Sequence, residues 1–227
     1  MSDFDIMCWN KYGDLMENTV KWFRSIGCSY RSSPWRQEFL YKYSKGIGLD
    51  LGCGLASTTR ELLKNKYLVK LILLDIVEET LVKICSYDHR IVCIRSDVLN
   101  IPFSNDLFDT VYLLAVLHHI PGVDCRLHVL REVYRVLKPC GYFILTVWNP
   151  ILSVLLKNMD YIDYGDKNYL LVDKNGARYY YFYELDELVD QVMTCGFNIV
   201  ESGFFIQNID KPDITRNIYV VAIKSSK

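Results

Sequence analysis

Small and acidic residues that could bind a polar ligand recur where apolar segments of the chain end. Glycines let a backbone approach a ligand closely, and a helix that begins after them offers free N–H groups. Carboxylates accept hydrogen bonds from hydroxyl and amino groups. These features favour a ligand that carries both kinds of group and that binds at one edge of a sheet. The set consists of Asp50, Gly52, Gly54, Asp75 and Asp97.

The charge of Asp50 separates two kinds of ligand. The glycines of residues 48–56 (GLDLGCGLA) also fit a dinucleotide, and the carboxylate of Asp75 could accept the ribose hydroxyls of either ligand. A carboxylate at Asp50 would repel a pyrophosphate. S-adenosylmethionine (SAM) has no phosphate, and its amino group and sulfonium are cationic. We therefore expect SAM as the cofactor.

Asp97 is the third carboxylate at the end of an apolar segment. We interpret it as facing the exocyclic amine of adenine, with the N–H of Val98 nearby, and a helix or turn cap is the alternative. Neighbours of the glycines and carboxylates complete the predicted cofactor site. Its residues are Asp50, Gly52, Cys53, Gly54, Asp75, Ile76, Asp97, Val98 and Ala115.

Apolar segments alternate with amphipathic ones, which predicts an α/β fold with three layers: a mostly parallel sheet covered by helices on both faces. The last two apolar segments predict a closing antiparallel pair. The seven predicted strands are 47–51, 69–75, 90–96, 108–115, 142–148, 197–205 and 217–223. The predicted helices are 9–26, 57–64 with Ser57 as a possible N-cap, 78–85, 124–137 and 183–195.

The length of 227 residues and the 51% hydrophobic composition suit a single domain. Within 1–227 we expect four segments: an N-terminal helix and loop (1–45), the cofactor-binding core (46–148), an insertion over one sheet edge (149–178), and a closing helix with strands (179–227). An aromatic stripe on the first helix is interpreted as core packing rather than as a ligand box. It consists of Trp9, Tyr12, Met16, Val20 and Phe23.

Composition argues against several other classes of protein. The net charge is −1, so no strong overall field attracts nucleic acid, although a basic stretch at 21–45 is either a solvated helix face or a nucleic-acid contact. The eight cysteines form no CxxC pair, so we expect no metal site and free thiols in a reducing cytoplasm. Apolar runs too short for a bilayer and an N-terminus without a secretory pattern predict a cytoplasmic protein without membrane contact.

Two runs resemble the SAM-dependent methyltransferase superfamily, namely residues 108–120 (FDTVYLLAVLHHI) and 130–141 (LREVYRVLKPCG). Three shorter pieces are similar to the tRNA wobble-uridine carboxymethyl methyltransferases, which include the methyltransferase domain of the tRNA-modifying AlkB homologue. These pieces are 30–35 (YRSSPW), 147–148 (VW) and 178–183 (RYYYFY). The resemblance covers the chain from about residue 28 onward and implies a Rossmann-like class I methyltransferase fold.

Three residues depart from the pattern of that family. Ala56 stands at the position of its third glycine, and Cys140 at the position of the glycine that follows Lys-Pro. Tyr181 replaces a histidine, which weakens any role of that position. The SAM site should tolerate the first change, while the assignment of the substrate depends more on the last.

The resemblance implies a tRNA methyltransferase that esterifies the carboxymethyl group of 5-carboxymethyluridine at the wobble position. A carboxylate is already ionised at neutral pH, so it needs alignment and a cation rather than a general base. Arg31 and Arg178 are the candidate cations, although Arg178 could instead pair with a local acid such as Asp173 or Glu184. The remaining candidates are His118 and His119 beside the methyl position and Trp35 and Tyr180 for stacking on a base.

The resemblance also implies tRNA as a partner and a small zinc-binding activator protein that adds a strand to the sheet. The apolar segment 90–96 could form the edge that such a protein covers. Two alternatives remain. One is a methyltransferase for a small molecule such as a quinone or lipid precursor, which would not need the arginines. The other is a non-catalytic SAM-binding or scaffold subunit, against which the intact set of acids argues.

Overall fold

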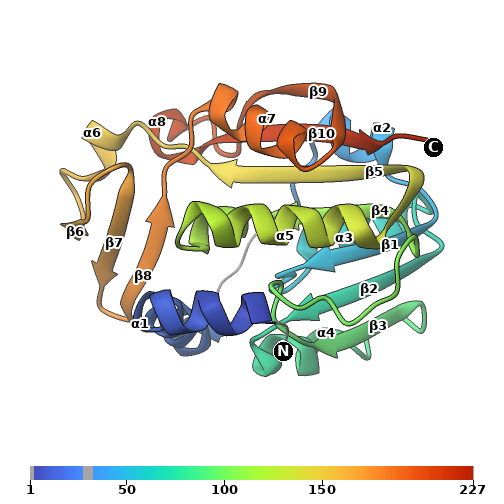
Figure 1. Cartoon of the computed structure of the whole chain (residues 1–227), viewed down its shortest axis with the longest axis horizontal. Helices are drawn as coiled ribbons and strands as arrows, with labels where there is room; N and C mark the ends of the chain where they lie inside the picture. The colour runs from blue at the N-terminus through green and yellow to red at the C-terminus, as the bar shows by residue number, and fades with distance from the viewer. Residues whose placement is uncertain (1–2, 28–32, 227) are drawn as a thin grey trace.

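Seven strands form one mixed sheet through the middle of the molecule in the computed structural model, which describes residues 3–27 and 33–226 (Figure 1). The strand order is β3-β2-β1-β4-β5-β10-β9. The predicted seven-stranded sheet is therefore confirmed. Its strands are β1 (Ile47–Leu51), β2 (Lys70–Asp75), β3 (Ile91–Arg95), β4 (Phe108–Leu114), β5 (Leu137–Trp148), β9 (Phe197–Ile206) and β10 (Arg216–Lys224).

The direction of the strand order changes next to β1. β1 pairs in parallel with β2 on one side and with β4 on the other, and β10 runs antiparallel to both β5 and β9. Loops that leave β1 and β4 therefore diverge to opposite sides of the sheet. Ligands of open α/β sheets bind in the crevice that such a divergence opens.

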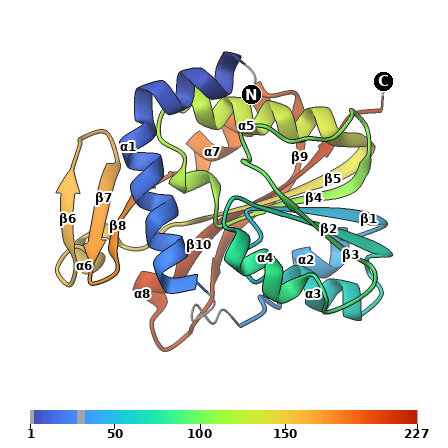
Figure 2. The same cartoon turned by 90° about the horizontal axis from the view of Figure 1, so that it is seen from below.

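Helices cover both faces of the sheet (Figure 2). The helices α5 and α7 pack on one face and α2, α3 and α4 on the other, and each face has its own cluster of buried apolar side chains. Because both faces are covered, the central strands are mostly apolar on both faces. The bounds are α2 (Glu38–Tyr43), α3 (Ser57–Lys64), α4 (Glu78–Ile84), α5 (Val123–Val136), α7 (Leu185–Thr194), the short helices α6 (Leu152–Leu155) and α8 (Pro212–Thr215), and the 3-10 turn η2 (Leu117–His119).

A second, three-stranded antiparallel sheet follows β5, and the first helix packs on it. Its strands are β6 (Asp160–Asp163), β7 (Asn168–Asp173) and β8 (Gly176–Tyr181). The helix α1 (Asp3–Ile26) runs beside β8, where Thr19 Oγ1 accepts a hydrogen bond from the Tyr179 N–H at 2.9 Å. The segment 149–178 contains β6, β7 and the start of β8, and β8 continues to Tyr181 and contacts α1 and η2 beyond the carboxyl end of β4 (Figure 2).

Several predicted boundaries and one cap need correction. The residue before α3 is Ala56, which has a left-handed backbone, and Ser57 is the first residue of the helix rather than its N-cap. β5 begins at Leu137 instead of residue 142, with Cys140 at φ 61° inside it. The helix predicted over 183–195 is shorter at both ends: Glu184 is extended before α7, and Cys195 is the cap residue after it.

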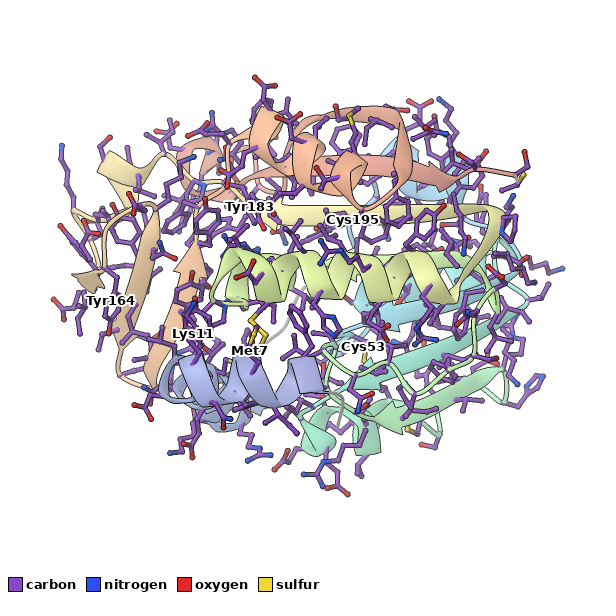
Figure 3. All side chains as sticks on the ribbon, viewed as in Figure 1. Met7, Lys11, Cys53, Tyr164, Tyr183 and Cys195 are labelled. Atoms are coloured by element: carbon purple, nitrogen blue, oxygen red, sulfur yellow. A yellow bond between two sulfur atoms is a disulfide. The ribbon has the colours of Figure 1, made fainter. Side chains whose placement is uncertain are left out.

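The prediction of free thiols was wrong for four cysteines. Disulfides join Cys8 to Cys125 and Cys85 to Cys93, and the first of them links α1 to α5 (Figure 3). Cys53, Cys140 and Cys195 are free, and Cys28 lies outside the described residues. Within residues 3–27 and 33–226, the helices are all too short or too polar to cross a membrane.

Candidate functional site

A cavity of about 480 Å³ opens at the carboxyl ends of β1, β2 and β4. Side chains and loops from both sheets and from α1 line it, so segments far apart in the sequence meet there. Every sequence-predicted site residue that the structure describes borders this one cavity, and Arg31 lies outside the described residues. The residues brought together are Asp50, Gly52, Cys53, Gly54, Asp75, Ile76, Asp97, Val98, Ala115, His118, His119, Arg178, Trp35 and Tyr180.

Two glycines in the turn after β1 have separate reasons to lack a side chain. Gly52 has φ +65°, and a Cβ there would lie 2.6 Å from Cγ2 of Val116. Gly54 has φ +49°, and a Cβ there would meet nothing within 4 Å. Gly52 is therefore required by close packing against the loop after β4, whereas Gly54 leaves open space at the cavity wall. Both backbones lie in the left-handed region that favours glycine.

Asp75 borders the cavity and accepts hydrogen bonds from two loops. Its Oδ2 accepts a hydrogen bond from the Gly54 N–H at 2.7 Å, and its Oδ1 accepts one from the Val77 N–H at 2.8 Å. Burial raises the pKa of this carboxyl, while the backbone donors lower it. Each oxygen keeps a second lone pair for a ligand hydroxyl. Asp75 thus joins the glycine turn to the loop that precedes α4.

Asp50 is almost completely buried, and no cation pairs with it among residues 3–27 and 33–226. Its Oδ2 accepts a hydrogen bond from the Thr59 hydroxyl at 2.6 Å. Burial raises the pKa of Asp50 to about 7. A cationic group bound in the cavity would favour its ionised form, because opposite charges attract more strongly where water is excluded. Thr59, in the first turn of α3, is a residue of the site that was not predicted from the sequence.

Asp97 both caps a turn and borders the cavity. Its Oδ1 accepts the Leu99 N–H at 3.0 Å, as the alternative interpretation required, and its Oδ2 accepts the indole N–H of Trp9 at 3.0 Å. The Trp9 contact corrects the interpretation of the aromatic stripe on α1. Trp9, together with Met16, Val20 and Phe23, faces the cavity instead of serving only as core packing. Large aromatic rings on a helix that precedes the strand–helix alternation were the sequence feature that could have indicated this cavity-facing role.

His118 and His119 are adjacent in the turn after β4, and their backbone contacts fix opposite tautomers. The Trp148 N–H donates to His118 Nδ1 at 3.2 Å, so in the neutral ring Nε2 of His118 carries the proton. His119 Nδ1 lies 2.9 Å from the Tyr179 carbonyl, which only accepts, so Nε2 of neutral His119 keeps its lone pair. Burial lowers the pKa of both rings, that of His119 to about 4. Both histidines are therefore neutral at physiological pH.

Arg178 contributes a cation to the cavity wall and pairs with Asp173, the local acid that the alternative interpretation named. Its Nη1 lies 3.5 Å from Oδ2 of Asp173, and its guanidinium carbon lies 3.6 Å from the centroid of the Trp22 ring. The Trp22 indole N–H donates to Asp173 Oδ1 at 2.9 Å. The Arg178 Nε is buried without a hydrogen-bond partner among the described residues. This guanidinium is thus held in place with donor capacity left over.

The two predicted stacking residues lie in different surroundings. Tyr180 is buried, with its ring parallel to that of His118 at 5.3 Å and near Trp148 at 5.1 Å. Trp35 is half-buried beside the glycine turn, where its backbone N–H donates to the Thr58 hydroxyl at 3.0 Å. Tyr180 therefore belongs to a packed aromatic wall, whereas Trp35 lies at the rim.

The basic stretch at 21–45 is not a continuous free patch. Lys21 pairs with Glu17 at 2.8 Å, Arg36 with Glu61 at 3.4 Å, and Lys42 with Glu201 at 3.4 Å. Lys45 precedes β1 and so lies at the end of the sheet opposite the cavity. Acids on the same helix and on other elements therefore compensate much of the local excess of positive charge.

Comparison with known proteins agrees with this geometry. Residues 49–145 match the family described as "Methyltransferase domain". A tRNA (carboxymethyluridine(34)-5-O)-methyltransferase of Arabidopsis thaliana is 35% identical over 32% of this chain and 18% of its own length. Sterol 24-C-methyltransferase erg6 of Schizosaccharomyces pombe is 26% identical over 90% of this chain and 57% of its own length. The chain thus spans less than two thirds of either relative.

The fold itself has many solved counterparts. A SAM-dependent methyltransferase from Methanosarcina mazei has a TM-score of 0.71 at 19% identity, over 84% of this chain and 99% of that chain. A chain from the complex between the Haloferax volcanii Trm112 methyltransferase activator and a methyltransferase has a TM-score of 0.61 at 15% identity, over 99% of this chain and 97% of that chain.

The strand order, the glycine turn and the family match define a class of protein. The chain carries a class I SAM-dependent methyltransferase domain. The cofactor of this class is SAM, as the charge of Asp50 predicted.

Proposed function

We propose that the chain is a tRNA methyltransferase that esterifies the carboxymethyl group of 5-carboxymethyluridine at the wobble position. The observation that carries this proposal is a held guanidinium, Arg178, beside two neutral histidines in an aromatic cavity. A substrate carboxylate needs a cation to orient it, and a neutral substrate does not. The Arabidopsis relative named for the carboxymethyluridine reaction supports the same substrate.

The residues present fit SAM. The buried carboxylate of Asp50 suits the amino group, Asp75 keeps lone pairs for the ribose hydroxyls, and Asp97 with the Val98 N–H suits the adenine edge. Gly54 leaves room at the cavity wall, with Cys53, Ile76 and Ala115 beside it. When bound, SAM supplies an electrophilic methyl group.

Arg178 acts by positioning the substrate carboxylate. Too strong a contact would stabilise the ground state and slow the reaction, because only interactions that are stronger in the transition state accelerate it. Asp173 shares the guanidinium and so limits the strength of its contact with the substrate. Neutral His118 and His119 need not remove a proton, because a carboxylate is already ionised. Their role is to orient and to shield the reacting groups.

Aromatic side chains supply the base contact in this proposal. Trp35 lies at the rim, where an unstacked base could lie against its ring, and Tyr180 lies deeper, against His118. Arg31, outside the described residues, remains a second candidate for the carboxylate. Trp9 and Phe23 close the cavity from the side of α1 and exclude water from it.

A strand-adding activator protein is the proposed partner. β3 is an edge of the main sheet, and Val92 within it is 38% exposed. An unpaired edge strand is a ready template for another chain. The structural neighbour from the complex with the Trm112 methyltransferase activator supports a partner of this kind. The same partner would also supply positive charge that this chain lacks.

A small-molecule methyltransferase is the second candidate. The apolar lining of the cavity, with Met16, Trp22 and Phe23, would suit a lipid precursor, and the sterol methyltransferase relative aligns with most of the chain. Arg178 discriminates between the two functions, because a neutral lipid has no use for a guanidinium.

The test uses labelled SAM and bulk tRNA that carries carboxymethyluridine, with and without a co-expressed activator, followed by nucleoside analysis. We expect a methyl ester on the wobble uridine. Arg178→Gln should lower kcat/KM by about tenfold to a hundredfold, because a charge-assisted contact is lost. Arg216→Gln is the matched control, since Arg216 Nε donates only to the Asn149 carbonyl at 3.0 Å. Label in a sterol or quinone precursor, and none in tRNA under any condition, would exclude the tRNA function.

A further inference from the structure

A second cavity, of about 440 Å³, lies on the other face of β8 from the first. Successive residues of a strand point to opposite faces. Tyr180 borders the first cavity, and Tyr179 and Tyr181 border the second. The helix α1 is divided in the same way, with Met16 toward the first cavity and Tyr12 toward the second. The second cavity is thus separate from the proposed methyl-transfer site.

A buried cation without an anionic partner borders this cavity. Arg126 is only 3% exposed, and it forms no ion pair with any residue of 3–27 or 33–226. Its Nη1 donates to the Ile120 carbonyl at 3.2 Å, and its Nε has no partner among those residues. Arg126 also forms a side-chain hydrogen bond with Tyr179, so Nε is the donor that is left unused. A buried charge without a counter-ion is strongly destabilising.

Stacking offsets only part of that cost. The guanidinium carbon of Arg126 lies 3.7 Å from the centroid of the Tyr181 ring and 5.5 Å from that of Tyr183. Cation–π contacts stabilise the charge, but they leave its in-plane N–H donors unsatisfied. A structural role for the arginine would therefore be better served by a nearby carboxylate. The tyrosine rings instead leave the Nε donor of the guanidinium without an acceptor.

The start of α5 adds a second source of positive potential at the same cavity. Pro121, Gly122 and Val123 border the cavity, and no side chain caps the helix at Gly122. The first N–H groups of a helix have no partner within it, and its N-terminus attracts anions. Lys11, labelled with Tyr164 in Figure 3, places its ammonium 5.1 Å from the centroid of the Tyr12 ring. The one opposing charge that borders the cavity among the described residues is Asp166.

We propose that this second cavity binds a phosphate group, with Arg126 as its buried cation and the N-terminus of α5 as its backbone donor. A phosphate supplies the negative charge and the acceptor oxygens that would complement both the guanidinium and the helix N-terminus. The phosphate could belong to an RNA backbone or be free in solution. Neither source requires that the chain transfer a methyl group, so the site is independent of the proposed function.

The test measures binding of inorganic phosphate by ³¹P NMR and calorimetry, with S-adenosylhomocysteine filling the first cavity. Arg126→Gln should weaken binding at least tenfold, because the buried charge is lost. Arg131→Gln removes the same charge from an exposed position on α5 and should change nothing. Asp166→Asn should tighten binding about two- to fivefold, as expected for removal of an exposed like charge. Competition by a single-stranded oligoribonucleotide would identify the RNA backbone as the source, and its absence a free phosphate.

Asp166 is exposed, so Asp166→Asn should fold normally. This variant therefore still tests the proposal if Arg126→Gln fails to fold. A purely structural Arg126 predicts no phosphate binding and no effect of Asp166→Asn. The proposal is overturned by wild-type protein that binds no phosphate at concentrations up to about 20 mM. It is equally overturned by binding that neither variant alters.

Discussion

At the scale of single residues, the two departures from the family's glycines share one conformation. Ala56 has φ 49° and Cys140 has φ 61°, both in the left-handed region where glycine carries no penalty. Glycine would therefore fit the backbone at both positions without strain. A sequence comparison marks such changes as substitutions, and only the backbone angle shows their cost.

Ala56→Gly should therefore stabilise the protein, by about 0.5–1 kcal/mol in urea unfolding. Relief of the left-handed strain exceeds the loss of one buried methyl group. Ala222→Gly is the matched control, because Ala222 is equally buried in β10 but extended, so glycine there should destabilise by about 1 kcal/mol. A loss of stability of the same size in both variants would contradict the prediction.

Asp50 should make stability depend on pH. Burial raises the folded-state pKa of Asp50 to about 7, so the folded protein holds this proton more tightly than the unfolded chain. The contribution of Asp50 to the free energy of unfolding therefore falls as pH rises from about 4 to about 7. Asp50→Asn should be more stable than wild type by about 2–4 kcal/mol at pH 8 and equal to it at pH 4. It should also bind SAM at least tenfold more weakly.

Urea unfolding between pH 4 and 8, with calorimetry for SAM, checks both parts. Asp88→Asn is the opposite case, since Arg90 lowers the pKa of the half-buried Asp88 and removal of this carboxylate should destabilise the protein near neutral pH. A constant difference between Asp50→Asn and wild type at all pH values would show that Asp50 is ionised throughout.

At the scale of elements, the helix α1 joins the two sheets across the mouth of the first cavity. Thr19 Oγ1 contacts β8 directly by accepting from the Tyr179 N–H at 2.9 Å, and it donates to the Leu15 carbonyl of its own helix at 2.8 Å. The disulfide from Cys8 to Cys125 attaches the same helix to α5. The wall of aromatic rings on α1 thus keeps its place through contacts at several points.

Thr19→Val should detach α1 from β8 locally. The change preserves shape but leaves the buried Tyr179 N–H without an acceptor, which costs about 1–3 kcal/mol. Thr194→Val on α7 is the control, because its hydroxyl donates only to the Asp190 carbonyl at 2.8 Å and is exposed. Hydrogen exchange at the Tyr179 amide should accelerate in the first variant alone. Protection equal to that of wild type would show that α1 is held without this bond.

The strands of the main sheet were predictable because apolar runs of strand length alternate with amphipathic helices. The start of β5 was not, because Lys138-Pro139-Cys140-Gly141 has the composition of a turn. A register shift between Phe108 and Thr110 absorbs it and keeps the segment in the sheet. The small sheet escaped prediction because β6 is exposed along its whole length and shows no alternation. The ring of Trp9 reaches Asp97 across 88 positions, a contact that no local pattern encodes.

At the scale of the whole molecule, acids compensate bases both within one helix and between distant elements. The net charge is −1, and Lys21, Arg36 and Lys42 all have acidic partners. An RNA substrate would therefore gain little affinity from this chain alone. The partner proposed at the β3 edge has a physical reason to contribute the missing charge.

Binding of tRNA to the isolated chain should thus depend only weakly on salt. The slope of log K against log salt should be shallower than about −3, because few phosphates are neutralised. Fluorescence anisotropy at several salt concentrations measures it. The double variant Glu17→Gln and Glu61→Gln frees Lys21 and Arg36 and should steepen the slope. A slope beyond about −6 for the wild-type chain would show an extensive basic surface.

The position of β8 between two cavities has a consequence for the tolerance of this chain to insertions. β8 pairs with β7 through a register that ends at Asp173 and Gly176, and its tyrosines differ in surroundings but hardly in chemistry. A shift of one residue exchanges the faces of every side chain in a strand. Tyr180 would leave the SAM cavity and Arg178 would leave with it, although no residue had been replaced. Length changes in this hairpin that move β8 by an even number of residues would keep each side chain on its present face, and odd ones would exchange the faces at both cavities together.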